Sequence, residues 1–166
     1  MVALPDTGGD IYRQHQHVWK AMHGDFRHGR EFVYSMLSPH LALVRSTRLS
    51  RGVTSVLPEH SMKATLVTAA QTPDGLRRLD REEARGMVAS LLHRHGIMAA
   101  RIEISSQRMA TGCKVDRVTG RRHVIAVPVS DVIFDARVHQ PALAQLAWRD
   151  GIGRGKRFGF GMLQKV

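Results

Sequence analysis

The sequence predicts an α+β fold with one complete strand–helix–strand–strand–helix–strand unit, preceded by a shortened copy of the same unit. Two observations support this prediction. Between residues 62 and 163, apolar patterns typical of strands and helices follow one another in that order. Residues 2–48 repeat only the beginning of that order, with a short strand, a helix and a hairpin. We therefore expect a shortened N-terminal domain over residues 1–59 and a complete C-terminal domain over residues 60–166.

The C-terminal domain begins with a predicted strand over residues 62–70, which carry a single charge, Lys63. Asp80 is a candidate helix N-cap, and Glu83 three residues later completes a capping box. Apolar residues follow at helical spacing, and Gly96 is expected to end the helix. These apolar positions are Ala84, Met87, Val88, Leu91 and Leu92.

The remaining elements of this domain complete the unit. Residues 97–104 are a predicted strand, residues 105–121 a long polar stretch, and residues 122–136 a second β-rich run. Residues 141–149 form a predicted short helix with Pro141 in its first turn, and residues 158–163 a last strand. This order is the ferredoxin-like arrangement that RNA-recognition domains share.

The sequence of the N-terminal domain predicts fewer strands and helices. Residues 2–4 are a strand stub, and a helix over residues 10–23 follows, which Asp10 can cap. Strands over residues 32–37 and 41–48 form a predicted hairpin that turns at Ser38, Pro39 and His40. Residues 50–59 have the composition of a loop or linker.

Composition and charge narrow the class of partner. The 25 Lys and Arg residues outnumber 14 Asp and Glu, which gives a net charge of +11. Such an excess favours a polyanion, usually nucleic acid, although a solvated basic surface is the alternative. Aromatic residues make up 5%, so structured RNA held through its backbone is favoured over a stacked single strand. The single cysteine, Cys113, excludes an internal disulfide and fits a cytoplasmic protein, and no apolar run predicts a membrane span.

The first predicted helix carries a candidate proton-transfer residue. His15 lies at the edge of the apolar stripe of that helix, and Tyr12 precedes it by one turn. A histidine held in one orientation suits proton transfer near neutral pH. The alternative is a half-buried histidine without a catalytic role.

Residues 151–161, which we call the glycine segment, hold five glycines and three cations. Glycine allows a close backbone approach to an anion, so the segment is a candidate phosphate-contacting loop. It fits neither a Walker nor a Rossmann loop. A tight helix-to-strand connection is the alternative. Its candidate RNA-binding residues are Gly151, Gly153, Arg154, Lys156, Arg157, Gly159 and Gly161.

Residues 105–123, which we call the arm, form a predicted basic hairpin or loop with its tip at residues 118–120. A ribbon of this kind can follow an RNA groove through phosphate contacts, although a surface loop is equally compatible with the pattern. The candidate RNA-binding residues are Arg108, Lys114, Arg117, Arg121 and Arg122.

The sequence predicts no metal site and no cofactor. His15 with His17, and His93 with His95, can each offer two ligands, but no third ligand is suitably spaced. Nor do the residues assemble a Ser-His-Asp triad.

Two segments together resemble the CasE group of CRISPR repeat-RNA endoribonucleases. These are Asp-Ile-Tyr-x-x-His-Gln-x-x-Trp from residue 10 and Gly-Ile-Gly-x-x-Lys-x-x-Gly-x-Gly-Met-Leu from residue 151. The resemblance implies a tandem ferredoxin-like fold and a CRISPR repeat RNA hairpin as partner. It also implies one cut at the 3′ base of the stem, giving guide RNAs that stay with other subunits of an effector complex. His15 is then catalytic, Tyr12 supports it, and the glycine segment contacts RNA.

For such a cleavage we expect a metal-independent mechanism. The RNA supplies its 2′-OH as nucleophile, and His15 transfers a proton as general base or general acid. Tyr12 orients His15 or bonds the phosphate, and Lys20 is a candidate for stabilising the phosphorane charge. The expected products carry a 2′,3′-cyclic phosphate, or its opened form, and a 5′-OH.

Other functions fit parts of the pattern. The main alternative is a non-catalytic RNA-binding subunit of a ribonucleoprotein, which would bind the hairpin without cutting it. A two-histidine phosphodiesterase or ligase-like enzyme requires a second histidine motif, which the sequence does not offer convincingly. No helix-turn-helix pattern supports a DNA-binding regulator.

Overall fold

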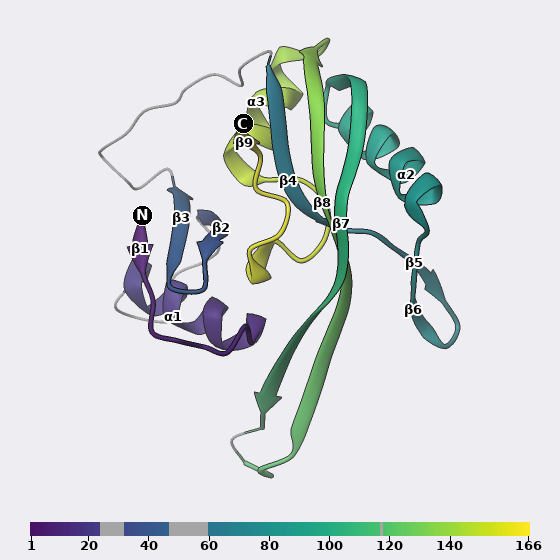
Figure 1. The fold of residues 1–166 in the computed structure, drawn as a ribbon. Helices are drawn as coiled ribbons and strands as arrows, with labels where there is room; N and C mark the ends of the chain where they lie inside the picture. The colour runs from purple at the N-terminus through teal and green to yellow at the C-terminus, as the bar shows by residue number, and fades with distance from the viewer. Residues whose placement is uncertain (24–31, 47–59, 117) are drawn as a thin grey trace.

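The computed structural model describes residues 1–23, 32–46, 60–116 and 118–166. The predicted linker over residues 50–59 and the last two residues of the strand predicted over 41–48 lie outside these ranges. Within them, an N-terminal and a C-terminal sheet lie side by side, and a long two-stranded arm extends away from both (Figure 1).

The N-terminal half consists of β1 (Val2–Ala3), α1 (Ile11–His23), β2 (Phe32–Ser38) and β3 (Leu41–Ser46). Its three strands are antiparallel in the order β1-β3-β2, which confirms the strand stub, the helix and the hairpin that the sequence predicts. Val18 of α1 packs against Tyr34, Ala42 and Val44 of the sheet, so α1 covers one face.

The C-terminal half has the ferredoxin-like order. Its elements are β4 (Ser61–Val67), α2 (Arg81–Arg94), β7 (Ile97–Val115), β8 (Arg122–Val138), α3 (Pro141–Asp150) and β9 (Gln164–Lys165). The four antiparallel strands follow the order β7-β8-β4-β9. Both helices pack on one face of this sheet, where Met62, Val88, Phe134 and Trp148 are among the buried core residues.

Local signals define the helices of this half well. The Asp80 carboxylate accepts the Glu83 N–H at 2.8 Å, and the Glu83 carboxylate accepts the Asp80 N–H at 3.0 Å, so the predicted capping box is confirmed. Pro141 stands in the first turn of α3 as expected. Gly96 follows α2 with a φ of +75°, in the left-handed region where glycine is favoured.

The strand predicted over residues 62–70 is interrupted, which corrects the prediction. Val67 is the last β4 residue paired with β8, opposite Val129. The next position faces Pro128, whose carbonyl accepts the Thr68 N–H at 3.1 Å. Proline has no N–H to return, so the ladder cannot continue. The chain instead forms a separate hairpin, β5 (Ala69–Thr72) and β6 (Gly75–Arg78), which the sequence did not predict.

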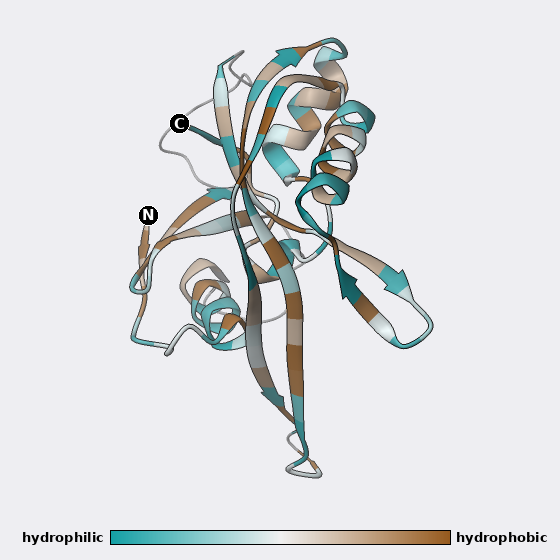
Figure 2. Cartoon of the chain, turned by 45° about the vertical axis from the view of Figure 1, so that its right-hand side comes forward, coloured by the Kyte–Doolittle hydropathy of each residue, from teal (hydrophilic) through white to brown (hydrophobic). Residues whose placement is uncertain are grey.

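The strands around the predicted polar stretch are longer than expected. β7 continues from the predicted strand through residue 115, and β8 pairs with it along its whole length. Residues 105–123 are therefore a hairpin, one of the two predicted alternatives. Hydrophobic and hydrophilic residues both continue along this arm beyond the sheet (Figure 2).

The prediction of a last strand over residues 158–163 is wrong. A short 3₁₀ helix, η1 (Lys156–Phe158), precedes an irregular segment, and the last strand is β9. Gly159 and Gly161 have φ values of +84° and +82°, which an extended strand does not allow. The apolar residues that suggested a strand are buried in this irregular conformation.

Arg45 joins the two halves. Its guanidinium donates to the carbonyl oxygens of Trp148 and Leu163, the latter at 3.0 Å, and lies 3.7 Å from the centre of the Trp148 ring. Burial lowers the pKa of Arg45 to about 10, so the side chain stays charged at neutral pH. Within the described ranges, no helix is long and apolar enough to cross a membrane.

Candidate functional site

Helix α1 begins at a capping carboxylate. One oxygen of Asp10 accepts the N–H groups of Tyr12 at 2.8 Å and Arg13 at 3.0 Å. These are two of the N–H groups that the first turn of a helix leaves without a partner. Asp10 therefore fixes the start of the helix that carries Tyr12 and His15.

His15 lies against the glycine segment. Its half-buried ring is 6.0 Å from the Phe158 ring, edge to face, and 5.9 Å from the Trp19 ring. Phe158 ends η1 inside the glycine segment. The fold thus brings together the two segments that carry the sequence resemblance, although they lie near opposite ends of the chain.

Tyr12 and Lys20 occupy different surroundings on α1. Tyr12 is partly buried and packs against a hydrophobic cluster that includes Ala110 of the arm and Phe158, and Ile125 and Val127 pack against the same cluster. Lys20 is exposed, and at 3.6 residues per turn it points about 140° away from His15 around the helix. Tyr12 and His15 share one side of α1, Lys20 does not, and the roles of all three residues stay predictions.

Internal packing requires the glycines of the glycine segment. Gly151, Gly153, Gly159 and Gly161 all have positive φ. A Cβ at Gly159 would lie 2.7 Å from Tyr34 Cε2, and one at Gly161 would lie 1.9 Å from the Ile152 carbonyl oxygen. The segment therefore folds tightly on itself and against β2.

The N–H groups of three of these glycines are used inside the fold. Gly151 donates to the Ala147 carbonyl at 2.9 Å, Gly159 to the Lys156 carbonyl at 3.1 Å, and Gly161 to the Thr65 carbonyl at 2.7 Å. All three glycines are buried. These three N–H groups are therefore taken by carbonyl groups within the fold, and contact between the glycine segment and RNA stays a prediction.

The cations of the glycine segment remain candidate RNA contacts. Arg154 and Arg157 are exposed, and the Arg157 guanidinium lies 4.7 Å from the centre of the Phe158 ring. The Tyr34 hydroxyl donates to the Arg157 carbonyl at 3.2 Å and fixes the backbone there. Lys156 folds back, with its Nζ 3.3 Å from the Gly151 carbonyl oxygen. Arg157 is therefore a cation positioned next to the ring that His15 contacts.

The arm ends in a turn that Asp116 organises. The Asp116 carboxylate accepts the N–H groups of Val118 at 3.0 Å and Thr119 at 2.7 Å. These bonds lower the pKa of Asp116. The turn closes at Gly120, whose φ is +68°, so the predicted tip at residues 118–120 is confirmed. Arg117 lies outside the described residues.

The candidate cations of the arm are not equivalent. Arg108 forms an ion pair with Asp131 at 2.5 Å, and the Arg122 Nε lies 3.4 Å from Cys113 Sγ. Lys114 and Arg121 are exposed near the tip. Because its charge is already paired, Arg108 has less to offer a phosphate than Lys114 or Arg121.

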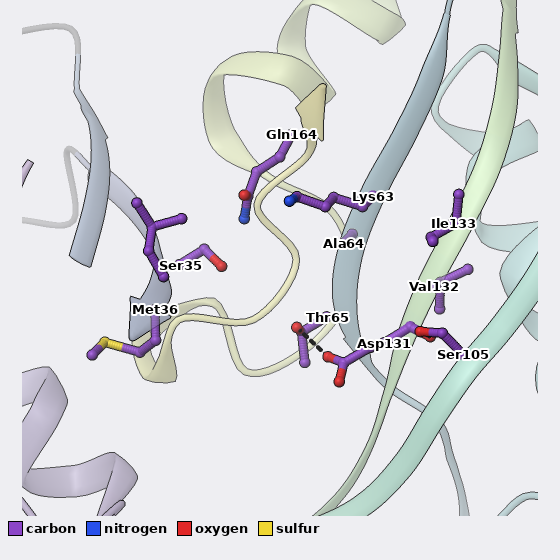
Figure 3. A pocket seen from close by; sticks show the side chains of 11 residues that line it. Ser35, Met36, Lys63, Ala64, Thr65, Ser105, Asp131, Val132, Ile133 and Gln164 are labelled. Carbon is purple, nitrogen blue, oxygen red and sulfur yellow. Dashed lines mark hydrogen bonds between the residues drawn. The ribbon is translucent and has the colours of Figure 1, made fainter. Parts of the chain in front are cut away.

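A polar cleft between the two halves was not predicted from the sequence. It encloses about 250 Å³, and Figure 3 shows Ser35 of β2 facing Lys63 of β4 and Gln164 of β9 across it. The Thr65 hydroxyl donates to the Asp131 carboxylate at 2.6 Å on its wall. None of the lining residues is aromatic, so this cleft offers no ring on which an RNA base can stack. The polar residues Lys63 and Thr65, alternating with apolar ones, were the available signal.

Three solved structures share the fold over nearly the whole chain. The Thermus thermophilus Cse3 bound to an RNA representing a pre-cleavage complex has a TM-score of 0.75 at 17% identity, covering 98% of this chain and 95% of that one. The CRISPR-associated protein Cas6e from Escherichia coli K-12 has a TM-score of 0.56 at 13% identity, with coverages of 98% and 95%. A chain of a CRISPR RNA-guided surveillance complex has a TM-score of 0.63 at 15% identity, with coverages of 93% and 88%.

These likenesses place the chain in a defined class of fold, the tandem ferredoxin-like proteins. Its solved neighbours within that class include the CRISPR endoribonuclease Cse3 and the CRISPR-associated protein Cas6e, so the fold expected from the sequence resemblance is confirmed. No protein-family model matches the chain, and no curated protein matches its sequence. Within the described ranges, no group of three His, Cys, Asp or Glu side chains is arranged to hold a metal ion.

Proposed function

We propose that this protein is an endoribonuclease that binds the hairpin of a CRISPR repeat transcript and cuts it at the 3′ base of the stem. One observation carries the proposal. Helix α1 sets His15 against Phe158 of the glycine segment, and its first turn lies against Gly112 of the basic arm. The candidate proton-transfer residue thus lies beside the segment that carries Arg157, on a helix whose first turn also contacts the arm. Solved neighbours bound to RNA support the same proposed function.

The proposed reaction uses the 2′-OH of the RNA as nucleophile and needs no metal. The 2′ oxygen attacks the adjacent phosphorus as its proton passes to a base, and the bond to the 5′ oxygen breaks as that oxygen gains a proton. The products are a 2′,3′-cyclic phosphate and a 5′-OH. His15 is the proposed proton-transfer residue, as base or as acid, because imidazole titrates near neutral pH.

Tyr12 and Lys20 have supporting roles in this proposal. Tyr12 lies one turn from His15 and shares its side of the helix, so its hydroxyl can orient the imidazole or bond the scissile phosphate. Lys20 is exposed, and it can reach the negative charge of the phosphorane only if the RNA passes along α1.

The proposed RNA surface combines the arm with the exposed side of the glycine segment. Lys114, Arg121 and Arg122 of the arm, with Arg154 and Arg157, are the cations that we assign to phosphate contacts. The product is proposed to stay bound and to join other subunits of an effector complex. The likeness to a chain of a surveillance complex supports this partner class.

The test compares wild type with His15→Ala and His17→Ala on a labelled CRISPR repeat hairpin in excess EDTA. His17 is a matched control, because it lies on the same helix but does not share the side of Tyr12 and His15. We expect one cut by wild type and by His17→Ala, and none by His15→Ala while binding persists. A 2′-deoxy substitution at the cut site should abolish cleavage.

Three outcomes would contradict the proposal. Tight hairpin binding without cleavage by wild type would favour the alternative, a non-catalytic RNA-binding subunit of a ribonucleoprotein complex. Equal cutting by wild type and His15→Ala would show that another residue transfers the proton. Loss of cleavage in EDTA that added Mg²⁺ restores would refute the metal-independent mechanism.

A further inference from the structure

The carboxylate of Asp10 bridges two elements that the proposed function needs together. While one of its oxygens caps α1, the other accepts the backbone N–H of Cys113 in β7 at 3.0 Å. Asp10 itself is only half-buried, and it is the residue immediately before the helix. A single side chain therefore holds the start of α1 against the arm.

The topology of the sheet explains why this N–H is available. β7 is an outer strand in the order β7-β8-β4-β9, so the N–H groups on its free side have no strand partner. Cys113 lies opposite Val124 of β8 in the ladder, and the Cys113 N–H donates to the Asp10 carboxylate. The Asp10 side chain therefore both caps α1 and accepts an N–H of the edge strand.

Gly112 makes the close approach possible. A Cβ at this position would lie 2.9 Å from both Ile11 Cγ1 and the Tyr12 nitrogen, and 3.0 Å from Asp10 Oδ1. The φ of Gly112 is not in the left-handed region, so the requirement is for space rather than for backbone freedom. The first turn of α1 thus rests directly on the backbone of the arm.

We propose that Asp10 is a positioning residue that sets the proton-transfer helix relative to RNA bound on the arm. This inference rests on the proposed function. Tyr12, whose N–H the carboxylate accepts, is one turn before His15, and Lys114 directly follows Cys113. The Asp10–Cys113 bond therefore links α1, which carries the proposed proton-transfer residue His15, to β7, the strand that we assign to phosphate contacts. Asp10 acts through these neighbours and does not touch the RNA.

Two substitutions disturb this contact in different ways. Asp10→Asn keeps a good N-cap but has one acceptor oxygen instead of two, and its amide would oppose the Cys113 N–H. Gly112→Ala leaves every functional group in place and wedges a methyl group between the arm and α1. The matched controls are Asp6→Asn, an exposed carboxylate that accepts the Gly8 N–H, and Gly86→Ala, whose added Cβ meets no described atom within 4 Å.

The experiment measures hairpin affinity and the single-turnover cleavage rate of the bound complex, at a temperature well below each variant's Tm. We expect Asp10→Asn and Gly112→Ala to cut roughly 10- to 100-fold more slowly, because a displacement of about 1 Å has effects of this size. Their Kd should change by no more than about threefold, since the phosphate contacts that supply the affinity remain. Asp6→Asn and Gly86→Ala should match wild type.

Three results would overturn the inference. Cleavage by both test variants at the wild-type rate would refute the positioning role alone. A loss of affinity that accounts for the whole loss of cleavage would assign Asp10 to the binding surface instead. Binding without cleavage by wild type, visible before any variant is assayed, would refute the proposed function and the positioning role with it.

Discussion

Gly161→Ala is expected to be among the most damaging single substitutions in this protein. The added Cβ would lie 1.9 Å from the Ile152 carbonyl oxygen, which is backbone and cannot move aside as a side chain can. The φ of +82° adds strain for any residue with a Cβ. Gly120→Ala is the matched control, because it has a φ of +68° and meets no atom within 4 Å.

The magnitude follows from three contributions. A left-handed conformation costs an L-residue about 1–2 kcal/mol, and overpacking in a closed site costs about 1–3 kcal/mol. Moving Gly161 away from Ile152 also weakens two hydrogen bonds, Ile152 N–H to the Gly161 carbonyl at 2.8 Å and Gly161 N–H to the Thr65 carbonyl at 2.7 Å. At about 1 kcal/mol each, the total is about 4–7 kcal/mol, against about 1–2 kcal/mol for Gly120→Ala.

Equilibrium unfolding in urea, followed by tryptophan fluorescence, measures the difference. Gly153→Ala provides an intermediate case, since its Cβ would meet only the flexible Leu91 Cδ2, at 3.3 Å and a φ of +73°. We expect the loss of unfolding free energy to be largest for Gly161→Ala and smallest for Gly120→Ala. If Gly161→Ala falls within about 1 kcal/mol of Gly120→Ala, the steric argument is wrong.

Three further predictions concern stability and binding. Arg45→Ala should lower the unfolding free energy by about 3 kcal/mol in urea titrations, with Arg45→Lys in between, because a lysine cannot bond both carbonyls and cover the ring. Glu83 has its pKa lowered to about 2, chiefly by the hydrogen bond from Arg77, so its stabilising effect is present above about pH 4.5 and lost as the pH falls through 2. Glu83→Gln should therefore be less stable than wild type at pH 7, with a difference that shrinks in acid; a constant difference would contradict this. Lys114→Ala should reduce the slope of log Kd against log salt for the hairpin by about 1, whereas Arg101→Ala, on an exposed arginine already paired with Glu103, should leave it unchanged.

The sequence by itself determined the elements whose signals are local. The capping box joins residues three apart, the proline of α3 and the glycine after α2 act on their own backbone, and the apolar periodicity of each helix repeats within a few turns. Asp10, Asp80, Gly96 and Pro141 were therefore interpretable without knowledge of the fold. The net charge and the paired motifs around residues 10 and 151 were also visible at this level.

Only the tertiary structure decided features that depend on residues distant in the chain. The strand from residue 61 ends early because Pro128 of β8 faces Thr68, and no local signal at Thr68 reveals that neighbour. Likewise, His15 meets Phe158 because the two sheets pack side by side, and Asp10 finds the Cys113 N–H because β7 is an outer strand. Helical and turn propensities act over a few residues, whereas strand pairing and packing choose partners through space. The candidate residues could therefore be named from the sequence, but which of them lie close together in space could not be predicted from it.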